Sequence, residues 1–474
     1  MRSMLLAALF ATGAGAAMAA PTPQDRRLAD IAASVSAARL KADIARLVGF
    51  GTRHTLSSQT DPKRGIGASL RWSEAEFRKL GLEVATPSEM MSGARVPVPV
   101  KITDVLGVQR GTTRPNDVVI ISGHIDSRVT DVMNAKADAP GANDDGSGTA
   151  AVLEAAHVLS KHKFGGTIVY AVLMGEEQGL FGGKVLANYA KAQGWNVIAN
   201  LNNDIIGNSC GSDGVCNDKV VRLFSEGPRW QGHEDLAARQ RSLGGENDAP
   251  SRNISRFLDR LAERVPSIGL DVMQVWRNDR FGRGGDHTEL LNAGYPAIRF
   301  SVAVENYNWQ HQDLRTKKGV EYGDTIDKMD FPYLAKVTRL NVAALAALAS
   351  APPPPEPSVD GAVSTDTTVA WDPLVGAANY VIRWRRTDSN RWQLQRVIPA
   401  AAGVEGDACP RLDRDKASVL RRSCGIVLKG IRVDDWVFGV SSVSKDGFES
   451  PVASAVPGGA FKPYVAPPAK SPSP

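Results

Sequence analysis

The sequence predicts an α/β domain, with a mixed, mostly parallel sheet flanked by helices, followed by an all-β immunoglobulin-like sandwich. Upstream of residue 352, apolar strand-like runs alternate with helical patterns, which is typical of a sheet covered on both faces. Downstream, short alternating segments are separated by turn residues, as in a sandwich. The length of 474 residues, of which 43% are hydrophobic, allows more than one core, because single cores stop growing at about 250–300 residues.

A proline run at 352–355 marks the boundary between the two predicted domains. Such a run is extended and stiff, which suits a linker. We therefore expect five segments along the chain. They are a signal peptide at 1–19, the α/β domain at 20–351, the Pro-rich linker at 352–357, the β-sandwich at 358–458 and a disordered tail rich in Pro, Ala and Ser at 459–474.

The expected strands and helices of the α/β domain follow from its apolar runs. Residues 118–121 are continuously apolar and β-branched, which predicts a strand buried on both faces. Helical spacing follows at 148–162, and the alternation then repeats. The other expected elements are strands at 167–174, 196–201, 271–275 and 297–302 and helices at 179–192 and 330–350.

The second domain has its own strand pattern, with strands expected at 368–371, 380–384 and 437–440. An early Trp371, a strand that contains Tyr380 and a late stretch at 434–440 resemble a fibronectin type III domain in their order. The resemblance covers about residues 358–458. This domain could bind protein or polysaccharide, or only stabilise its neighbour.

The N-terminus has the pattern of a secretory signal peptide. Arg2 supplies the positive start, residues 4–18 are apolar, and Ala17-Met18-Ala19 fits a small-residue cleavage site. No later stretch reaches the ~18 uncharged apolar residues that a membrane span needs. We therefore expect a secreted or periplasmic protein that makes no membrane contact.

Charge and cysteine content narrow the function classes further. The formal charge of +5 is small, and the charged residues of the chain are interspersed. The sequence therefore lacks the clustered Lys and Arg that nucleic-acid binding needs. The four cysteines fall into two close pairs. Two local disulfides in an oxidising compartment are therefore expected, Cys210 with Cys216 and Cys409 with Cys424.

Five loops carry side chains that suit metal chemistry, and four of them end or follow a predicted strand. Ligands of open α/β sheets bind at the carboxyl ends of strands, so these loops could converge. The loops are Gly123-His124-Ile125-Asp126-Ser127, 141–150 with Asp144 and Asp145, 174–179 with Glu176 and Glu177, 202–207 with Asp204, and 306–311 with His311, with Asp324 and Asp327 further on.

Each loop also has a structural interpretation, since Asp145, for example, could simply cap the following helix. However, adjacent carboxylates repel each other unless a cation holds them, and glutamates at the mouth of an apolar strand are costly without a partner. Glu176 is left over as a base. Together the loops supply a nitrogen and oxygen set suited to zinc, made up of His124, Asp144, Glu177, Asp204 and His311.

These motifs, in this order over about residues 40–350, resemble the co-catalytic dizinc exopeptidases of the bacterial leucyl aminopeptidase type. The resemblance implies two Zn²⁺ per chain, bridged by Asp144, and Glu176 as the general base. Asp126 and Asp145 would support the ligands without binding metal. A cis peptide is implied between Asp144 and Asp145. The implied ligands are His124, Asp144, Glu177, Asp204 and His311.

The chain departs from this resemblance in a few places. Gln310 stands where some relatives have an oxyanion-binding Tyr just before the last His, and Tyr307 is the alternative donor. His287 competes with His311 as the last ligand. The stretch 208–281 is long, and we expect it to decorate the rim of the active site.

The implied activity is hydrolysis of the N-terminal peptide bond of a peptide or protein with a free N-terminus. Glu176 would take a proton from a metal-bound water and return it to the leaving amine. At an extended strand end, Glu176 and Glu177 would point in different directions and so have different tasks. The alternatives are a carboxypeptidase or dipeptidase, a one-zinc glutaminyl cyclase, which lacks the ligand at His124, and a non-catalytic protease-like binding protein.

Overall fold

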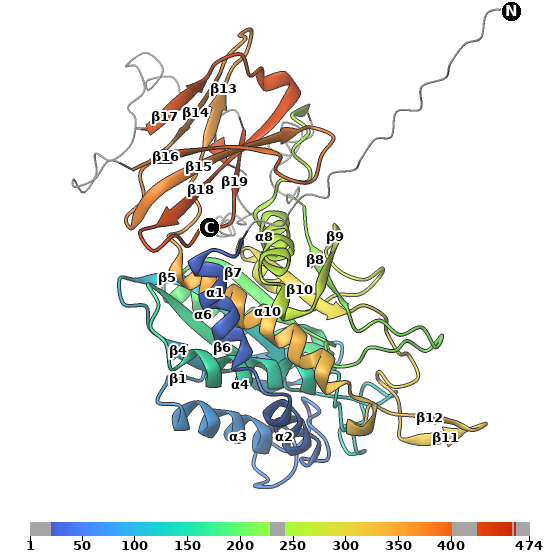
Figure 1. Ribbon diagram of the computed structural model, residues 1–474. Coiled ribbons are helices and arrows are strands. Elements are labelled where there is room, and N and C mark those ends of the chain that lie inside the picture. Colours follow the sequence, from blue (N-terminus) through green and yellow to red (C-terminus); the bar gives the residue numbers. More distant parts are fainter. Residues whose placement is uncertain (1–19, 228–241, 401–423, 457–458, 461–474) are drawn as a thin grey trace, which may run out of the picture.

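The computed structural model describes residues 20–227, 242–400, 424–456 and 459–460. An α/β body, formed by the described residues up to 351, carries a β-body formed by those from 358 onward (Figure 1). The expected signal peptide at 1–19 lies outside the described residues, as does all of the expected tail beyond residue 460.

The α/β body is built on one eight-stranded sheet in the order β1-β4-β6-β5-β7-β10-β8-β9. The central strands β6, β5, β7 and β10 pair in parallel, whereas β1, β4 and β8 form antiparallel pairs. The mixed, mostly parallel sheet predicted from the sequence is therefore confirmed. The strands are β1 Glu83–Ala85, β4 Val105–Gln109, β5 Arg114–His124, β6 Gly166–Leu173, β7 Asn196–Asn203, β8 Val220–Ser225, β9 Asp271–Val275 and β10 Ala297–Val302.

Alternate residues of β5 pack on opposite faces of this sheet and so create two cores. Val119 and Ile121 belong to the larger core, beneath α1, α2, α3, α4, α8 and α10. Val118 and Ile120 belong to the smaller core, beneath α6 and α9. The helices are α1 Pro23–Ala33, α2 Ala37–Val48, α3 Ile66–Lys79, α4 Gly146–Leu159, α5 Glu176–Gly179, α6 Phe181–Ala192, α8 Pro250–Arg264, α9 His287–Asn292 and α10 Phe331–Ser350.

The parallel strands bring the sequence motifs to one edge of the sheet. β5 ends at His124, β7 ends just before Asp204, and β6 ends shortly before Glu176. Because these strands run in the same direction, their carboxyl ends meet at a common edge. The loops that follow them can therefore form one site.

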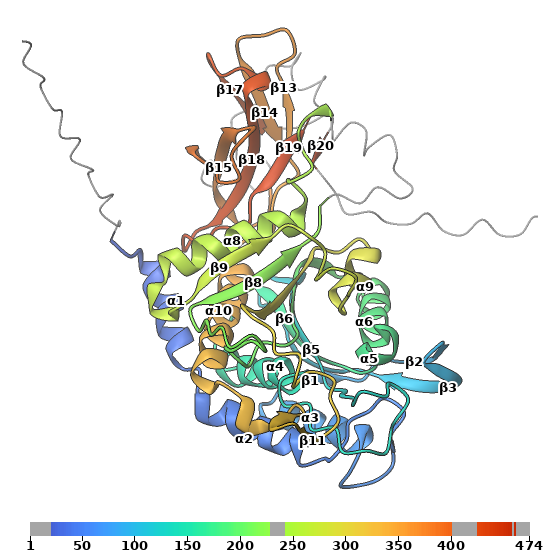
Figure 2. The same cartoon turned by 90° about the vertical axis from the view of Figure 1, so that its right-hand side faces the viewer.

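The stretch 208–281 does not only decorate a rim, so that expectation is wrong for most of it. It supplies β8, α8 and β9, which extend the sheet and cover it (Figure 2). Val221, Leu223 and Leu258 from this stretch are fully buried in the larger core. The short remaining elements are β2 Ser88–Gly93, β3 Val96–Thr103, β11 Arg315–Lys317, β12 Val320–Tyr322 and the 3₁₀ turns Pro266–Ile268, Ile326–Lys328 and Val433–Asp435.

The β-body follows the strand path β16-β15-β18-β19-β13-β14-β17, with β20 paired to β19. Val369 and Ile426 from one end of this path share a core with Ile382 and Phe438 from the other end, around the buried Trp371. The sheet therefore folds back on itself, as a sandwich does. The strands are β13 Ser358–Asp360, β14 Thr367–Trp371, β15 Ala377–Arg386, β16 Leu394–Pro399, β17 Cys424–Leu428, β18 Trp436–Ser444, β19 Ala453–Val456 and β20 Gly459–Ala460.

A disulfide joins Cys210 to Cys216, as expected. The second expected pairing lies outside the described residues, because Cys409 is not among them. Within the described parts of the chain, no helix is long and apolar enough to cross a membrane.

A buried ion pair fastens the β-body to the start of α8. Arg385 Nη2 on β15 donates to both carboxylate oxygens of Asp248 at 2.7 Å, and Ser454 Oγ on β19 donates to the same carboxylate at 2.8 Å. The side chains of Asp248 and Arg385 are 0% and 3% exposed. Neither charge can therefore turn to water if its partner is removed.

We predict that Arg385→Met lowers the free energy of unfolding by about 3 kcal/mol or more, because the carboxylate of Asp248 loses its closest cation in a buried place. Chemical denaturation followed by circular dichroism measures the change. Arg386→Met is the matched control, because its partner Asp388 is exposed and such pairs contribute about 0–1 kcal/mol. Adding Asp248→Asn to Arg385→Met should restore part of the loss. Equal stability of the two arginine variants would contradict this account.

Candidate metal centre

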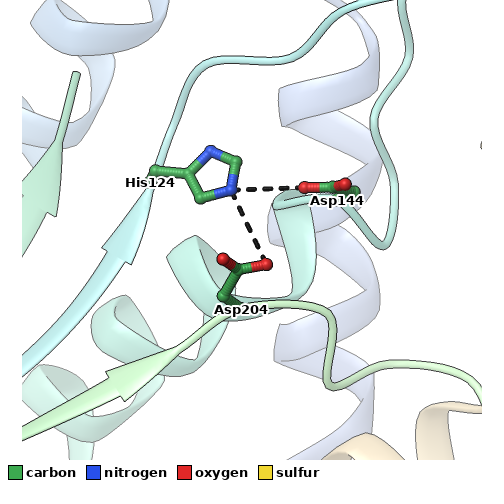
Figure 3. A group of neighbouring side chains, drawn as sticks. All are labelled: His124, Asp144 and Asp204. Carbon is green, nitrogen blue, oxygen red and sulfur yellow. Dashed lines mark ion pairs between the residues drawn. The ribbon is translucent and has the colours of Figure 1, made fainter. Parts of the chain in front are cut away.

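His124 is the last residue of β5, and its side chain is buried at the edge of the sheet. Its Nε2 lies 3.2 Å from Asp144 Oδ1 and 3.8 Å from Asp204 Oδ1 (Figure 3). On the other side of the ring, Nδ1 lies 3.1 Å from the backbone oxygen of Asp126 and 3.5 Å from its carboxylate. This second contact fixes the ring so that Nε2 faces the two carboxylates.

Asp144 and Asp145 share a turn but have different surroundings. Asp145 caps α4 by accepting from the backbone N–H of Gly148 at 2.9 Å, and it also accepts from the N–H of His124 at 3.1 Å. The peptide between the two aspartates is cis, as expected. Asp324 holds the turn from behind, accepting from the N–H of Asp144 at 2.7 Å. Only Asp144 is thereby left facing the histidines.

Glu176 and Glu177 begin the short helix α5 instead of continuing an extended strand, so the expected local geometry was wrong. The carboxylate of Asp126 accepts from the backbone N–H groups of Gly175, Glu176 and Glu177 at 2.9, 3.3 and 3.1 Å, and this network turns the chain into a helix. Successive helical side chains still diverge, because one residue turns a helix by about 100°. The two glutamates therefore still point in different directions.

His311 joins the site from the loop after β10. Its Nε2 lies 2.7 Å from Asp144 Oδ2 and 2.9 Å from Glu177 Oε1. Arg128 supports this corner, since its Nε lies 2.7 Å from Glu177 Oε2 and its Nη2 lies 2.6 Å from His311 Nδ1.

The predicted ligands thus form two groups that share Asp144. One is His124, Asp144 and Asp204, and the other is Asp144, Glu177 and His311; within each group the potential ligand atoms lie within 4.8 Å of one another. His124 Nε2 and Glu177 Oε1 are buried and, although Asp144 Oδ1 and His311 Nε2 lie 3.2 and 2.9 Å from them, make no hydrogen bond. Buried polar atoms without partners are costly, and a cation between them removes that cost. The imidazole and carboxylate donors fit zinc.

The charges of the site are strongly coupled. Burial raises the pKa of Glu176 well above its usual range, and the charges of Asp204 and Glu177 raise it further. Burial also opposes ionisation of Asp204, but Arg299 and His124 hold its pKa below the usual range. For His311 burial works to lower the pKa, yet Glu177 and Asp144 raise it to about 10. This concentration of carboxylates favours bound cations.

The structure shows where the residues of two open alternatives lie, those for the last ligand and those for the oxyanion donor. His287 begins α9 with its Nε2 2.8 Å from the backbone oxygen of Asn278, and burial lowers its pKa to about 4. It belongs to neither group, whereas His311 belongs to one. Gln310 Nε2 donates to Asp144 Oδ2 at 3.1 Å, while the side chain of Tyr307 is largely exposed.

Sequence reasoning missed three supporting residues. Arg128 follows the first motif, and Asp324 was noted but not assigned. Arg299 on β10 is fully buried and lies 2.7 Å from Asp204 Oδ1. An arginine inside the apolar run 297–302 was a signal that could have been read, because a buried charge needs an opposite charge nearby.

The chain is similar in sequence to known peptidases. Residues 104–331 match peptidase family M28. A probable zinc metalloprotease of Leptosphaeria maculans is 39% identical over 94% of this chain and 100% of its own length. One from Pyrenophora tritici-repentis is 34% identical over 92% of this chain and 98% of its own length.

Two solved structures, LapB and LapA of Legionella pneumophila, are similar in fold, each with a TM-score of 0.50 and 18% identity. They cover 69% of this chain and 75% and 77% of their own chains, respectively. At this identity the likeness concerns the fold alone. The match to the family and the two near-full-length relatives go further and show that the chain belongs to peptidase family M28.

Proposed function

We propose that this protein is a zinc-dependent exopeptidase, an aminopeptidase that hydrolyses the N-terminal peptide bond of peptides and proteins. The observation that carries the proposal is the pair of potential ligand groups that share Asp144, with Glu176 directly beside Glu177. The names of the relatives, probable zinc metalloproteases, support zinc as the metal.

Each residue of the site has a task in this proposal. Two zinc ions held by the two groups would polarise the substrate carbonyl and acidify a water. Glu176, which belongs to neither group, is free to take the proton from that water and pass it to the leaving amine. Asp126 fixes both His124 and the backbone of the glutamates, so it supports binding and proton transfer together.

Burial supports action at a chain end. The side chains of His124, Asp144, Glu177 and Asp204 are between 1% and 5% exposed, and only His311 reaches 23%. A site that opens mainly beside one ligand suits a terminus better than a continuous polypeptide. The resemblance of the motifs to the leucyl aminopeptidase type selects the N-terminus, and His124 in the first group disfavours the one-zinc cyclase alternative.

The proposal extends to location and to the β-body. We propose secretion, on the pattern of residues 1–19 and on the disulfide between Cys210 and Cys216, since disulfides persist in oxidising compartments. The fibronectin type III-like assignment of the β-body, and its binding of protein or polysaccharide, remain part of this proposal.

The purified protein should contain two zinc ions per chain, and a chelator should abolish hydrolysis until zinc is restored. Elemental analysis by mass spectrometry measures the content. Asp144→Asn should bring the zinc content below one per chain, because both groups use this carboxylate. Asp204→Asn should leave about one, because it belongs to one group only. Full activity of the metal-free protein would contradict the proposal.

Glu176→Gln and Glu177→Gln should have different effects. Glu176→Gln keeps the shape of the side chain but removes the base, so zinc content should stay at the wild-type level while kcat falls by about 10²–10⁴-fold. Glu177→Gln replaces an anionic ligand by a weak neutral one, so zinc content should fall, and added zinc should restore part of the activity.

The control for both variants is Glu321→Gln, which changes an exposed glutamate outside the site. It should alter neither zinc content nor kcat. The opposite pattern, in which Glu176→Gln loses zinc and Glu177→Gln loses only turnover, would mean that the two roles are exchanged.

A further inference from the structure

Three arginines converge on one buried glutamate beside the candidate metal centre. Arg222 Nη2 lies 2.6 Å from Glu305 Oε1, while Arg280 Nη1 and Arg283 Nη1 lie 3.2 and 2.9 Å from Oε2. The side chain of Glu305 is 3% exposed. Burial opposes its ionisation, but the three guanidinium charges hold its pKa below the usual range. Glu305 therefore faces three positive charges, of which, among the described residues, only that of Arg280 is also paired with a second carboxylate, Asp279.

Two of the three arginines make further contacts that tie the chain together. Arg280 Nε also lies 3.0 Å from Asp279 Oδ1, and its side chain is only 9% exposed. Arg222 Nε donates to the backbone oxygen of Val302 at 2.6 Å. These contacts hold the segment before α9 against β8 and β10. A purely structural role for the cluster is thus already filled without Arg283.

Arg283 has hydrogen-bond donors that no described residue uses. Its side chain is 32% exposed, and among the described residues its Nε and Nη2 have no hydrogen-bond partner. The carboxylate of Asp279 does not compensate the charge of Arg283, because it is already paired with Arg280 and Arg299. An arginine with two free donor positions and an uncompensated charge matches the planar geometry of a carboxylate.

Arg283 also borders the metal centre, through the side chain of Gln310. Its Nη1 donates to Gln310 Oε1 over 3.5 Å, and Gln310 Nε2 donates to Asp144 Oδ2 over 3.1 Å. An arginine can only donate hydrogen bonds, so the amide oxygen of Gln310 has to face it. The free donors of Arg283 therefore lie one side chain away from the carboxylate shared by the two ligand groups.

We infer that Arg283 binds a carboxylate of the substrate and makes the enzyme selective for peptides with an acidic group next to the cleaved bond. The inference rests on the proposed peptidase function and adds the class of substrate. The carboxylate has two possible sources, the side chain of an N-terminal Glu or Asp and the C-terminal carboxylate of a dipeptide. The cluster around Glu305 supplies the excess positive charge, and the exposure of Arg283 makes that charge accessible.

The test compares isosteric substrates on the zinc-loaded full chain. Glutamyl and glutaminyl aminomethylcoumarin amides differ only in the side-chain charge. We expect kcat/KM for the glutamyl amide to exceed that for the glutaminyl amide by about 10-fold or more. Arg283→Gln should lower kcat/KM for the glutamyl amide by about 10–100-fold, the loss typical of a charge-assisted hydrogen bond, and affect the glutaminyl amide much less. Arg283→Lys should keep part of the preference.

Arg277→Gln is the matched control. Arg277 lies in the same segment, is exposed and has its guanidinium over the ring of Phe281. Its replacement removes the same charge and should leave the ratio of the two kcat/KM values unchanged. A second pair of substrates, Leu-Leu and Leu-Leu amide, separates the two sources. If Arg283→Gln slows only Leu-Leu, the bound group is the C-terminal carboxylate.

A binding measurement separates this inference from the proposed function. Calorimetric titration of the zinc-loaded protein with L-glutamate and L-glutamine needs no turnover. Tighter binding of L-glutamate that disappears in Arg283→Gln supports the inference, whether or not any reporter is hydrolysed. A failure to hydrolyse any reporter would count against the proposed function alone. Equal affinity for both amino acids, together with equal effects of Arg283→Gln on both amides and no selective effect on Leu-Leu, would overturn the inference.

Discussion

The structure depends on gathering carboxylates at one buried edge of a parallel sheet. Strands β5, β6 and β7 end side by side, and the loops that follow them carry acidic residues. Such a concentration of negative charge in a buried place is unfavourable unless each carboxylate has a partner. The arrangement of the site follows from how those partners are supplied, and the carboxylates involved are Asp126, Asp144, Asp145, Glu176, Glu177 and Asp204.

The partners are of three kinds. Backbone N–H groups satisfy Asp126 and Asp145, which fixes the two loops, and neither residue belongs to a ligand group. Arginines compensate Asp204, at the oxygen nearest His124, and Glu177, at the oxygen that faces away from His311. Two of the remaining ligand atoms, His124 Nε2 and Glu177 Oε1, are buried and have no hydrogen-bond partner. The proposed zinc ions would complete this scheme.

Much of this could be predicted from the sequence, because strand ends and metal ligands leave local signals. The run 118–121 predicted β5, and the motifs that follow the strands predicted the residues that the structure brings together. What could not be predicted depends on distant contacts. The turn of Glu176 into α5 is set by Asp126, about fifty residues earlier, and the buried Asp248 has its arginine in the β-body. No local pattern encodes such pairings.

The central claim is that Asp144 bridges two metal ions. It is tested most directly by anomalous X-ray scattering at the zinc edge from crystals of the zinc-loaded protein. This account predicts two peaks about 3.5–4 Å apart, one between His124 and Asp204 and the other between Glu177 and His311, with one oxygen of Asp144 toward each. A single peak at full occupancy, or peaks that do not involve Asp144, would contradict it.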